Sequence, residues 1–202
     1  SSPSRVLGES GSSAGEDVVD KDGVLYMISS NSNNLLKSSD YGANWTTSSG
    51  NHGSNIGGGS GRIATDGTLI VFAYKAGDGY VYSKSTSDDG ATFSGTQLTL
   101  GTGVGTALMA DGLRFHDGKW FAILVNGQCA YSANGTSWTA GATVPDAIDN
   151  VSYGIGCIVV GSGYSKHYIS TNHGASWSEF AAPVAAGALA DTLWTFWIGD
   201  PP

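Results

Sequence analysis

The chain has 202 residues, of which 31 are glycine and only 13% are charged; seventeen acidic and nine basic side chains give a net charge of −8. So few cations argue against a nucleic-acid partner and against an anionic membrane surface, because both require clustered Lys and Arg. No run approaches the ~18–20 apolar residues that span a bilayer, so we expect no membrane insertion. An aromatic content of 10% is typical of a folded acidic protein rather than a disordered one.

Short apolar runs follow one another along the chain, rich in β-branched and aromatic residues and bounded by turn-forming residues. They lie at residues 24–28, 68–74, 119–125, 157–160 and 193–198. Asp-Gly precedes each of the first three runs and is a strong hairpin signal, because both central residues of the tight turn need positive φ. Helical periodicity is almost absent, so the pattern predicts an all-β chain.

A second repeat follows these turns, with the pattern Ser/Thr-x-Asp/Asn-x-Gly-x-x-aromatic. It occupies residues 38–45, 86–93, 131–138 and 170–177. Its aromatic residues are spaced by 48, 45 and 39 positions. Units of ~40–50 residues with about four short strands are typical of propeller blades. We therefore predict a small β-propeller with four full blades plus a composite or partial fifth.

These four segments resemble the Asp box, or BNR repeat, of sialidases and many other β-propellers. The resemblance covers residues 17–184, and the third copy has Ala133 where the acid belongs. It implies that each segment closes the turn between the third and fourth strands of a blade, on the face away from a catalytic funnel. The residues given this structural role are Asp40, Gly42, Trp45, Asp88, Gly90, Phe93, Gly135, Trp138, Asn172, Gly174 and Trp177.

The two ends of the chain are expected to close the ring. Residues 1–16 are predicted to be a flexible N-terminal segment that can contribute a closing strand, and residues 17–202 the propeller. The apolar run Arg5-Val6-Leu7 is then expected to pair with the strand at 193–198, which removes free sheet edges.

The loops on the other face are rich in amide, hydroxyl and aromatic side chains, which suit hydrogen bonding to a neutral polyhydroxy ligand or a protein surface. The alternative is that these loops are simply polar. The predicted ligand-binding residues are Asn31, Asn33, His52, Asn55, Asp78, Tyr80, Asn126, Gln128, Asp146, Asn150 and Tyr164.

Catalysis is tested by comparison with the sialidase set of three arginines, a Tyr/Glu pair and an acidic residue. The chain has only Arg5, Arg62 and Arg114, and none lies in a matching motif, so we do not expect sialidase activity. Other propeller glycosidases place three carboxylates around a central pit. Such a set could come from Asp78, Asp111, Asp146 and Asp149, although nothing in their spacing singles them out. We assign no catalytic residue and leave the enzyme question open.

No cofactor is predicted. Asp20-x-Asp22-Gly23 beside Glu16 and Asp17 could bind calcium, but the twelve-residue loop with its closing Glu is missing, so we interpret it as a solvated turn. The histidines lack metal-ligand spacing. Both cysteines, Cys129 and Cys157, lie in apolar runs and are interpreted as free thiols rather than a bridge.

These observations favour a non-enzymatic recognition module, extracellular or on a virion surface, that binds a glycan or host receptor through the loop face. A receptor-binding head of a phage spike or tail fibre, within a larger assembly, fits this composition by analogy. The alternatives are a glycosidase or polysaccharide lyase acting on surface polysaccharide, and a structural propeller that binds a protein.

Overall fold

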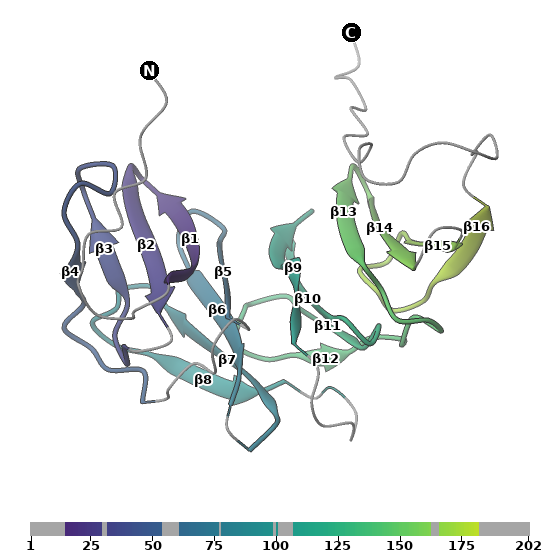
Figure 1. Ribbon diagram of the computed structural model, residues 1–202, viewed down its shortest axis with the longest axis horizontal. Coiled ribbons are helices and arrows are strands. Elements are labelled where there is room, and N and C mark those ends of the chain that lie inside the picture. The colour runs from purple at the N-terminus through teal and green to yellow at the C-terminus, as the bar shows by residue number, and fades with distance from the viewer. Residues whose placement is uncertain are drawn as a thin grey trace, which may run out of the picture.

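The computed structural model describes residues 15–29, 32–53, 61–76, 78–98, 100, 107–162 and 166–181 (Figure 1). Within these ranges all regular structure is strand, so the described residues contain no helix that could cross a membrane. The strands form four antiparallel sheets of four strands each, and the strands of every sheet are in chain order. The prediction of an all-β chain with four full blades is confirmed.

Each blade is a meander. Blade 1 comprises β1 (Gly15–Lys21), β2 (Val24–Ser29), β3 (Leu36–Ser38) and β4 (Thr46–Thr47). Blade 2 comprises β5 (Arg62–Thr65), β6 (Ile70–Lys75), β7 (Val81–Thr86) and β8 (Ser94–Gln97). Blade 3 comprises β9 (Leu108–His116), β10 (Lys119–Leu124), β11 (Cys129–Ser132) and β12 (Thr139–Ala140). Blade 4 comprises β13 (Asn150–Gly154), β14 (Cys157–Ser162), β15 (Lys166–Ser170) and β16 (Ser178–Ala181).

The blades follow one another along an arc, with blade 1 and blade 4 at its two ends (Figure 1). The first strands of consecutive blades adjoin, β1 with β5, β5 with β9 and β9 with β13. Side chains tie them together: Asp17 accepts a hydrogen bond from the Ile63 amide at 3.1 Å, and Arg62 Nε donates to the Met109 carbonyl at 2.8 Å. The first strands therefore form the inner side of the arc.

Three hydrophobic clusters fill the spaces between consecutive blades. Strand β6 shows why: Ile70 and Phe72 belong to the cluster with blade 1, while Val71 belongs to the cluster with blade 3. All three are 0% exposed. Successive side chains of a strand point to opposite faces, so a central blade buries both of its faces.

Residues 38–45, 86–93, 131–138 and 170–177, here named the wedge turns, each join the third strand of a blade to the fourth. In the first, Asp40 accepts hydrogen bonds from Ser38 Oγ at 2.7 Å and the Asn44 amide at 2.9 Å, and Ser38 Oγ accepts from the Gly42 amide at 2.8 Å. These bonds hold the pKa of Asp40 at about 2, with the bonds from Asn44 as the largest cause. Asp88 and Asn172 occupy the same place in the second and fourth wedge turns.

The third wedge turn differs from the sequence prediction, which aligns the four segments on their glycine and places Ala133 at the position of the acid. Asn134, not Ala133, takes the place of the acid: its Oδ1 lies 3.1 Å from Ser132 Oγ and accepts from the Ser137 amide at 2.8 Å. The other three wedge turns have a non-glycine residue with positive φ before the glycine, such as Tyr41 at 57°. Counted from its hydroxyl residue Ser132 to Trp138, the third turn is one residue shorter than Ser38 to Trp45. It lacks the residue with positive φ, so Asn134 lies directly before Gly135.

Wedge turns also contact the preceding blade. The Gly90 carbonyl accepts from the Gly50 amide and the Gly174 carbonyl from the Ala142 amide, both at 2.8 Å. Trp177 Nε1 donates to the Ala142 carbonyl at 2.9 Å. The second and fourth wedge turns are therefore hydrogen-bonded to the preceding blade.

The predicted closing strands, residues 5–7 and 193–198, lie outside the described residues, as does most of the N-terminal segment 1–16. Cys129 and Cys157 are free thiols, as expected.

A matched pair of glycine substitutions in blade 4 tests the wedge. A Cβ at Gly174 would lie 2.7 Å from Phe121 Cε2, whereas a Cβ at Gly156 would meet nothing within 4 Å; both residues have positive φ. Gly156→Ala should cost about 1–2 kcal/mol of unfolding free energy for the left-handed backbone alone. Gly174→Ala should cost about 1–3 kcal/mol more, because it also overpacks the core. Urea unfolding measures both, and equal losses would contradict a wedge pressed against blade 3.

Candidate functional site

Two sets of loops lie at the end of the sheets opposite the wedge turns. In an antiparallel meander, the turn between strands one and two and the turn between strands three and four share one end of the sheet. The loops between strands two and three, and those that join blades, therefore share the other end, here named the loop end. Every described residue of the predicted ligand-binding set lies in these loops or at a strand end beside them.

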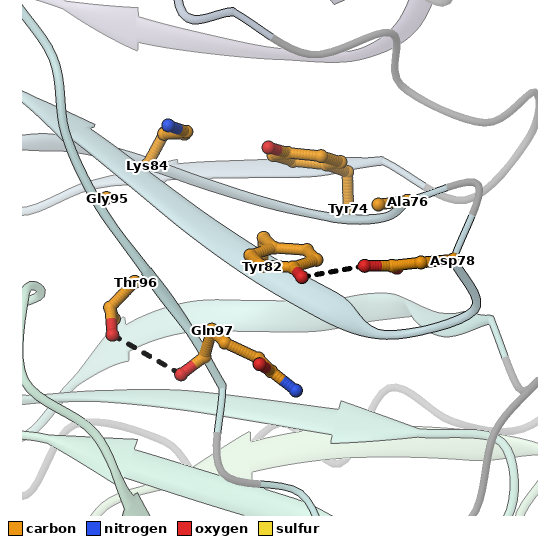
Figure 2. Close-up of a pocket in the computed structure, with 8 residues that line it drawn as sticks. All are labelled: Tyr74, Ala76, Asp78, Tyr82, Lys84, Gly95, Thr96 and Gln97. Carbon is orange, nitrogen blue, oxygen red and sulfur yellow. Dashed lines mark hydrogen bonds between the residues drawn. The ribbon is translucent and has the colours of Figure 1, made fainter.

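Blade 2 carries a cavity of about 390 Å³ at its loop end (Figure 2). It is lined by Tyr74, Ala76, Asp78, Tyr82, Lys84, Gly95, Thr96 and Gln97. The strand register explains this lining, because cross-strand partners point to the same face. Tyr74 pairs with Tyr82 and Tyr82 with Gln97, which places these three side chains in one row.

The two tyrosines of this row are stacked. Their ring centroids are 6.2 Å apart with an interplanar angle of 26°. Tyr74 is buried, while Tyr82 is half-buried and its hydroxyl points to Asp78 (Figure 2). Tyr82 therefore presents part of its ring to the cavity.

Asp78 lies in the loop between β6 and β7, and its side chain lines the cavity. Its carboxylate accepts hydrogen bonds from the Tyr80 amide at 3.0 Å and from the Tyr82 hydroxyl at 2.7 Å. These bonds lower the pKa of Asp78, and the bond to Asp78 raises the pKa of Tyr82. At neutral pH the cavity thus holds an ionised carboxylate beside a neutral, oriented phenol.

Lys84 occupies the next row of the same face, where it pairs with Gly95. A Cβ at Gly95 would lie only 2.4 Å from Lys84 Cδ, so the glycine leaves room for the lysine stem to lie across β8. Among the described residues, no acidic side chain forms an ion pair with Lys84. The cavity therefore has a cation that is not neutralised by an ion pair there.

His52, one of the predicted ligand residues, lies in the core rather than on the loop surface. It is 2% exposed and packs edge-on against Phe72 and Phe93, with centroid distances of 5.0 and 5.7 Å. Burial, and secondarily the Lys84 charge, lower the pKa of His52 to about 4. In this structure His52 seals the space between blades 1 and 2 beside the cavity.

The remaining predicted residues are mostly engaged within the chain. The Asn126 side chain Nδ2 donates to Gln128 Oε1 at 2.9 Å. Asn33 contributes its backbone carbonyl, which accepts from the His52 amide at 2.8 Å, while its side-chain Oδ1 is buried without a hydrogen-bond partner among the described residues. The Asn150 side chain lies across Gly161, where a Cβ would come within 2.8 Å of Asn150 Oδ1. Amide side chains that brace turns are less free to meet a ligand.

A second polar cluster lies at the loop end of blade 4. Asp146 accepts hydrogen bonds from the Tyr168 hydroxyl and from Lys166 Nζ, the latter at 3.0 Å, and both lower its pKa. Here the lysine is neutralised by the acid, unlike Lys84. Tyr80 is 40% exposed near the blade 2 cavity. Asn31, Asn55 and Tyr164 lie outside the described residues.

Sequence reasoning found Asp78 but missed its partners Tyr82, Lys84 and Gln97. They lie within strands, whereas the candidates were sought in loops. The signal available was the alternation Val81-Tyr82-Ser83-Lys84, in which two long polar side chains share one face. Their convergence with Gln97 depends on the β7–β8 register.

The acidic segment considered for calcium forms backbone hydrogen bonds. Asp20 accepts from the Gly23 amide at 3.2 Å, and both carboxylate oxygens of Asp17 accept backbone amides. Over the described ranges, no group of three or more His, Cys, Asp or Glu side chains could hold a metal ion.

Comparison with known proteins identifies the fold. No protein-family model and no curated protein matches the chain. Among solved structures, YCF48 from Cyanidioschyzon merolae superposes with a TM-score of 0.59 at 11% identity over 89% of this chain and 59% of its own. The chain has the β-propeller fold.

Other propellers agree. The GH74 enzyme of Niastella koreensis gives a TM-score of 0.53 at 23% identity, over 80% of this chain and 23% of that enzyme. The computationally designed Ika4 protein gives 0.56 at 13% identity, over 84% of this chain and 98% of Ika4. This chain thus spans less than two thirds of the natural propellers YCF48 and GH74, and at such identities the likeness defines the fold alone.

The pH dependence of unfolding tests the burial of His52. An unfolded His titrates near pH ~6.5, and its folded pKa is about 4, so the stability that His52 contributes is complete above pH 6.5. It should fall by up to about 1.4 kcal/mol per pH unit between pH 6.5 and 4, where only the unfolded state is protonated. Urea unfolding at several pH values should show a steeper loss in the wild type than in His52→Phe. Asp17, whose pKa burial raises, contributes equally to both proteins. Identical profiles would contradict a neutral buried imidazole.

Proposed function

We propose that this propeller is a non-enzymatic recognition module that binds a carbohydrate in the blade 2 cavity. The observation that carries the proposal is the cross-strand row Tyr74–Tyr82–Gln97 with Asp78 and Lys84 beside it. A cavity of about 390 Å³ is within the ~300–1,000 Å³ typical of small-ligand sites. This size suits one or two sugar rings.

The lining matches the two kinds of surface that a sugar presents. The C–H face of a pyranose packs on an aromatic ring, and the half-buried ring of Tyr82 offers that surface. Sugar hydroxyls need both acceptors and donors, which the ionised Asp78 carboxylate and the exposed Gln97 amide supply. Aromatic and amide groups on a prearranged sheet face lose little conformational freedom on binding.

Lys84 makes an acidic sugar the preferred ligand class. Its ammonium has no ion-pair partner among the described residues, so a carboxylate or sulfate on the ligand would form a charge-assisted hydrogen bond there. Since Asp78 repels anions, the acidic group is assigned to the Lys84 side of the cavity and the hydroxyls to the Asp78 side.

The biological setting follows from the earlier interpretation of the sequence. The module is proposed to act outside a cell or on a virion surface, as a glycan- or receptor-binding head within a larger fibre or spike. Its wedge turns are proposed to be Asp boxes. The side chain–backbone bonding of Asp40, Asp88, Asn134 and Asn172 supports this reading.

A protein partner is the second candidate. Structures of similar fold include a nidogen/laminin complex and YCF48 bound to a D1 peptide, with TM-scores of 0.52 and 0.50. In this chain the half-exposed Tyr80 at the same loop end would favour a peptide contact. A glycosidase or lyase would instead degrade the glycan it binds.

Glycan-array binding with three variants tests the proposal. Tyr82→Ala should abolish binding to every glycan that the wild type recognises, because it removes the ring platform. Lys84→Met should weaken acidic glycans at least about tenfold and leave neutral ones unchanged. Lys37→Met, which removes the same charge from β3 of blade 1, is the control and should bind like the wild type.

The same experiment separates the alternatives. Chain shortening of bound polysaccharide that disappears in Asp78→Asn would indicate an enzyme. Glycan binding unaffected by Tyr82→Ala would place the site elsewhere and contradict the proposal.

A further inference from the structure

Blade 1 exposes the face that blades 2, 3 and 4 each bury against the preceding blade. Each first strand has an apolar residue facing the preceding blade: Ile63, Leu113 and Val151 in blades 2, 3 and 4 are 5%, 5% and 9% exposed. The register-equivalent residue of blade 1, Val18, is 50% exposed. Within the described residues, blade 1 therefore carries a blade interface without its neighbour.

The first wedge turn likewise has no neighbouring blade to pack against among the described residues. Phe93, Trp138 and Trp177 each pack against one of the three interblade clusters, whereas Trp45 belongs to none of them. Trp177 Nε1 donates to the carbonyl of Ala142 in the preceding linker. Trp45 Nε1 instead donates to Gly42 in its own turn, at 3.1 Å. Tyr41, at the tip of the first wedge turn, is 84% exposed.

Blade 4 presents the complementary face at the other end of the arc. In blades 1 to 3, the second-strand residues Tyr26, Val71 and Phe121 point toward the following blade and are at most 2% exposed. Their register equivalent in blade 4, Val159, is only half-buried, as is its cross-strand neighbour Ile169.

The two end faces are thus the two halves of one interface that the chain forms three times internally. We propose that two copies of this chain associate head to tail, with blade 4 of each copy packed on blade 1 of the other. A head-to-tail interface gives a closed ring when the rotations from each copy to the next add up to a full turn. Two four-bladed arcs make eight blades, within the ~4–8 of known propellers, whereas three copies would exceed that range.

A second copy presents to each end face the complementary face of a complete blade. Blade 1 covers the face of blade 2 with Tyr26 and Ile28 of its second strand and with Leu35, which directly precedes its third strand. A second copy supplies complete blades at both ends.

Analytical ultracentrifugation of the full 202-residue chain tests the proposal. The wild type should sediment as a dimer with twice the 20.6 kDa chain mass. Val18→Asp should be monomeric, because it places a charge on the blade 1 face in both interfaces of the ring. Val159→Asp should also be monomeric, because it places a charge on the blade 4 face in both interfaces. Ile155→Asp, at a 74% exposed turn position of blade 4, is the control and should remain dimeric.

Mixing the two monomeric variants gives the decisive result. One interface of the mixed pair joins an unaltered blade 4 to an unaltered blade 1, so the mixture should recover a dimer that neither variant forms alone. Circular dichroism verifies that each variant is folded, and Met27→Glu replaces Val18→Asp should the latter unfold. A monomeric wild type at tens of micromolar would overturn the proposal. A mixture that stays monomeric would overturn the head-to-tail arrangement.

Discussion

Every blade of this protein depends on its neighbours, because its central strands are apolar on both faces. In β10, Trp120 and Phe121 are consecutive and both buried, one against blade 2 and the other against blade 4. A single four-stranded sheet cannot bury two such faces, so stacking of blades is the only way to remove them from water. The second, third and fourth wedge turns complete this stacking by packing an aromatic side chain against the interblade clusters, and Gly90 and Gly174 add carbonyls that accept hydrogen bonds from the preceding blade.

This division of work leaves the loop end free for other roles. The wedge turns and the tight turns between first and second strands occupy one end of every sheet, and the side chains of Asp40, Asp88, Asn134 and Asn172 accept backbone hydrogen bonds there. At the other end, blade 2 combines a stacked tyrosine pair, an ionised carboxylate and Lys84, for which the described residues provide no ion pair. The contrast with blade 4 is informative, since there Lys166 is neutralised by Asp146. Two strands with similar residue types thus acquire different electrostatics from the loops beside them.

The proposed ring and the proposed ligand site are compatible. The cavity lies on the face of blade 2 that looks toward blade 1, within one copy, whereas the proposed subunit contacts involve blades 1 and 4. A two-copy ring would carry two equivalent cavities, and paired sites on one rigid body strengthen attachment to a surface that displays many copies of a glycan. Each idea is nevertheless carried by separate observations.

The amino-acid sequence by itself determined the second strand of each blade, the number of full blades and the places of the wedge turns, because local turn chemistry and strand alternation depend on neighbouring residues. It misassigned the third turn, where a single missing residue moved the acid's role to Asn134. Only the tertiary structure decided that His52 is buried, and that Tyr82, Lys84 and Gln97 share a cavity with Asp78. Those outcomes depend on strand register and on packing between blades, which join residues far apart in the chain, so no local pattern could reveal them.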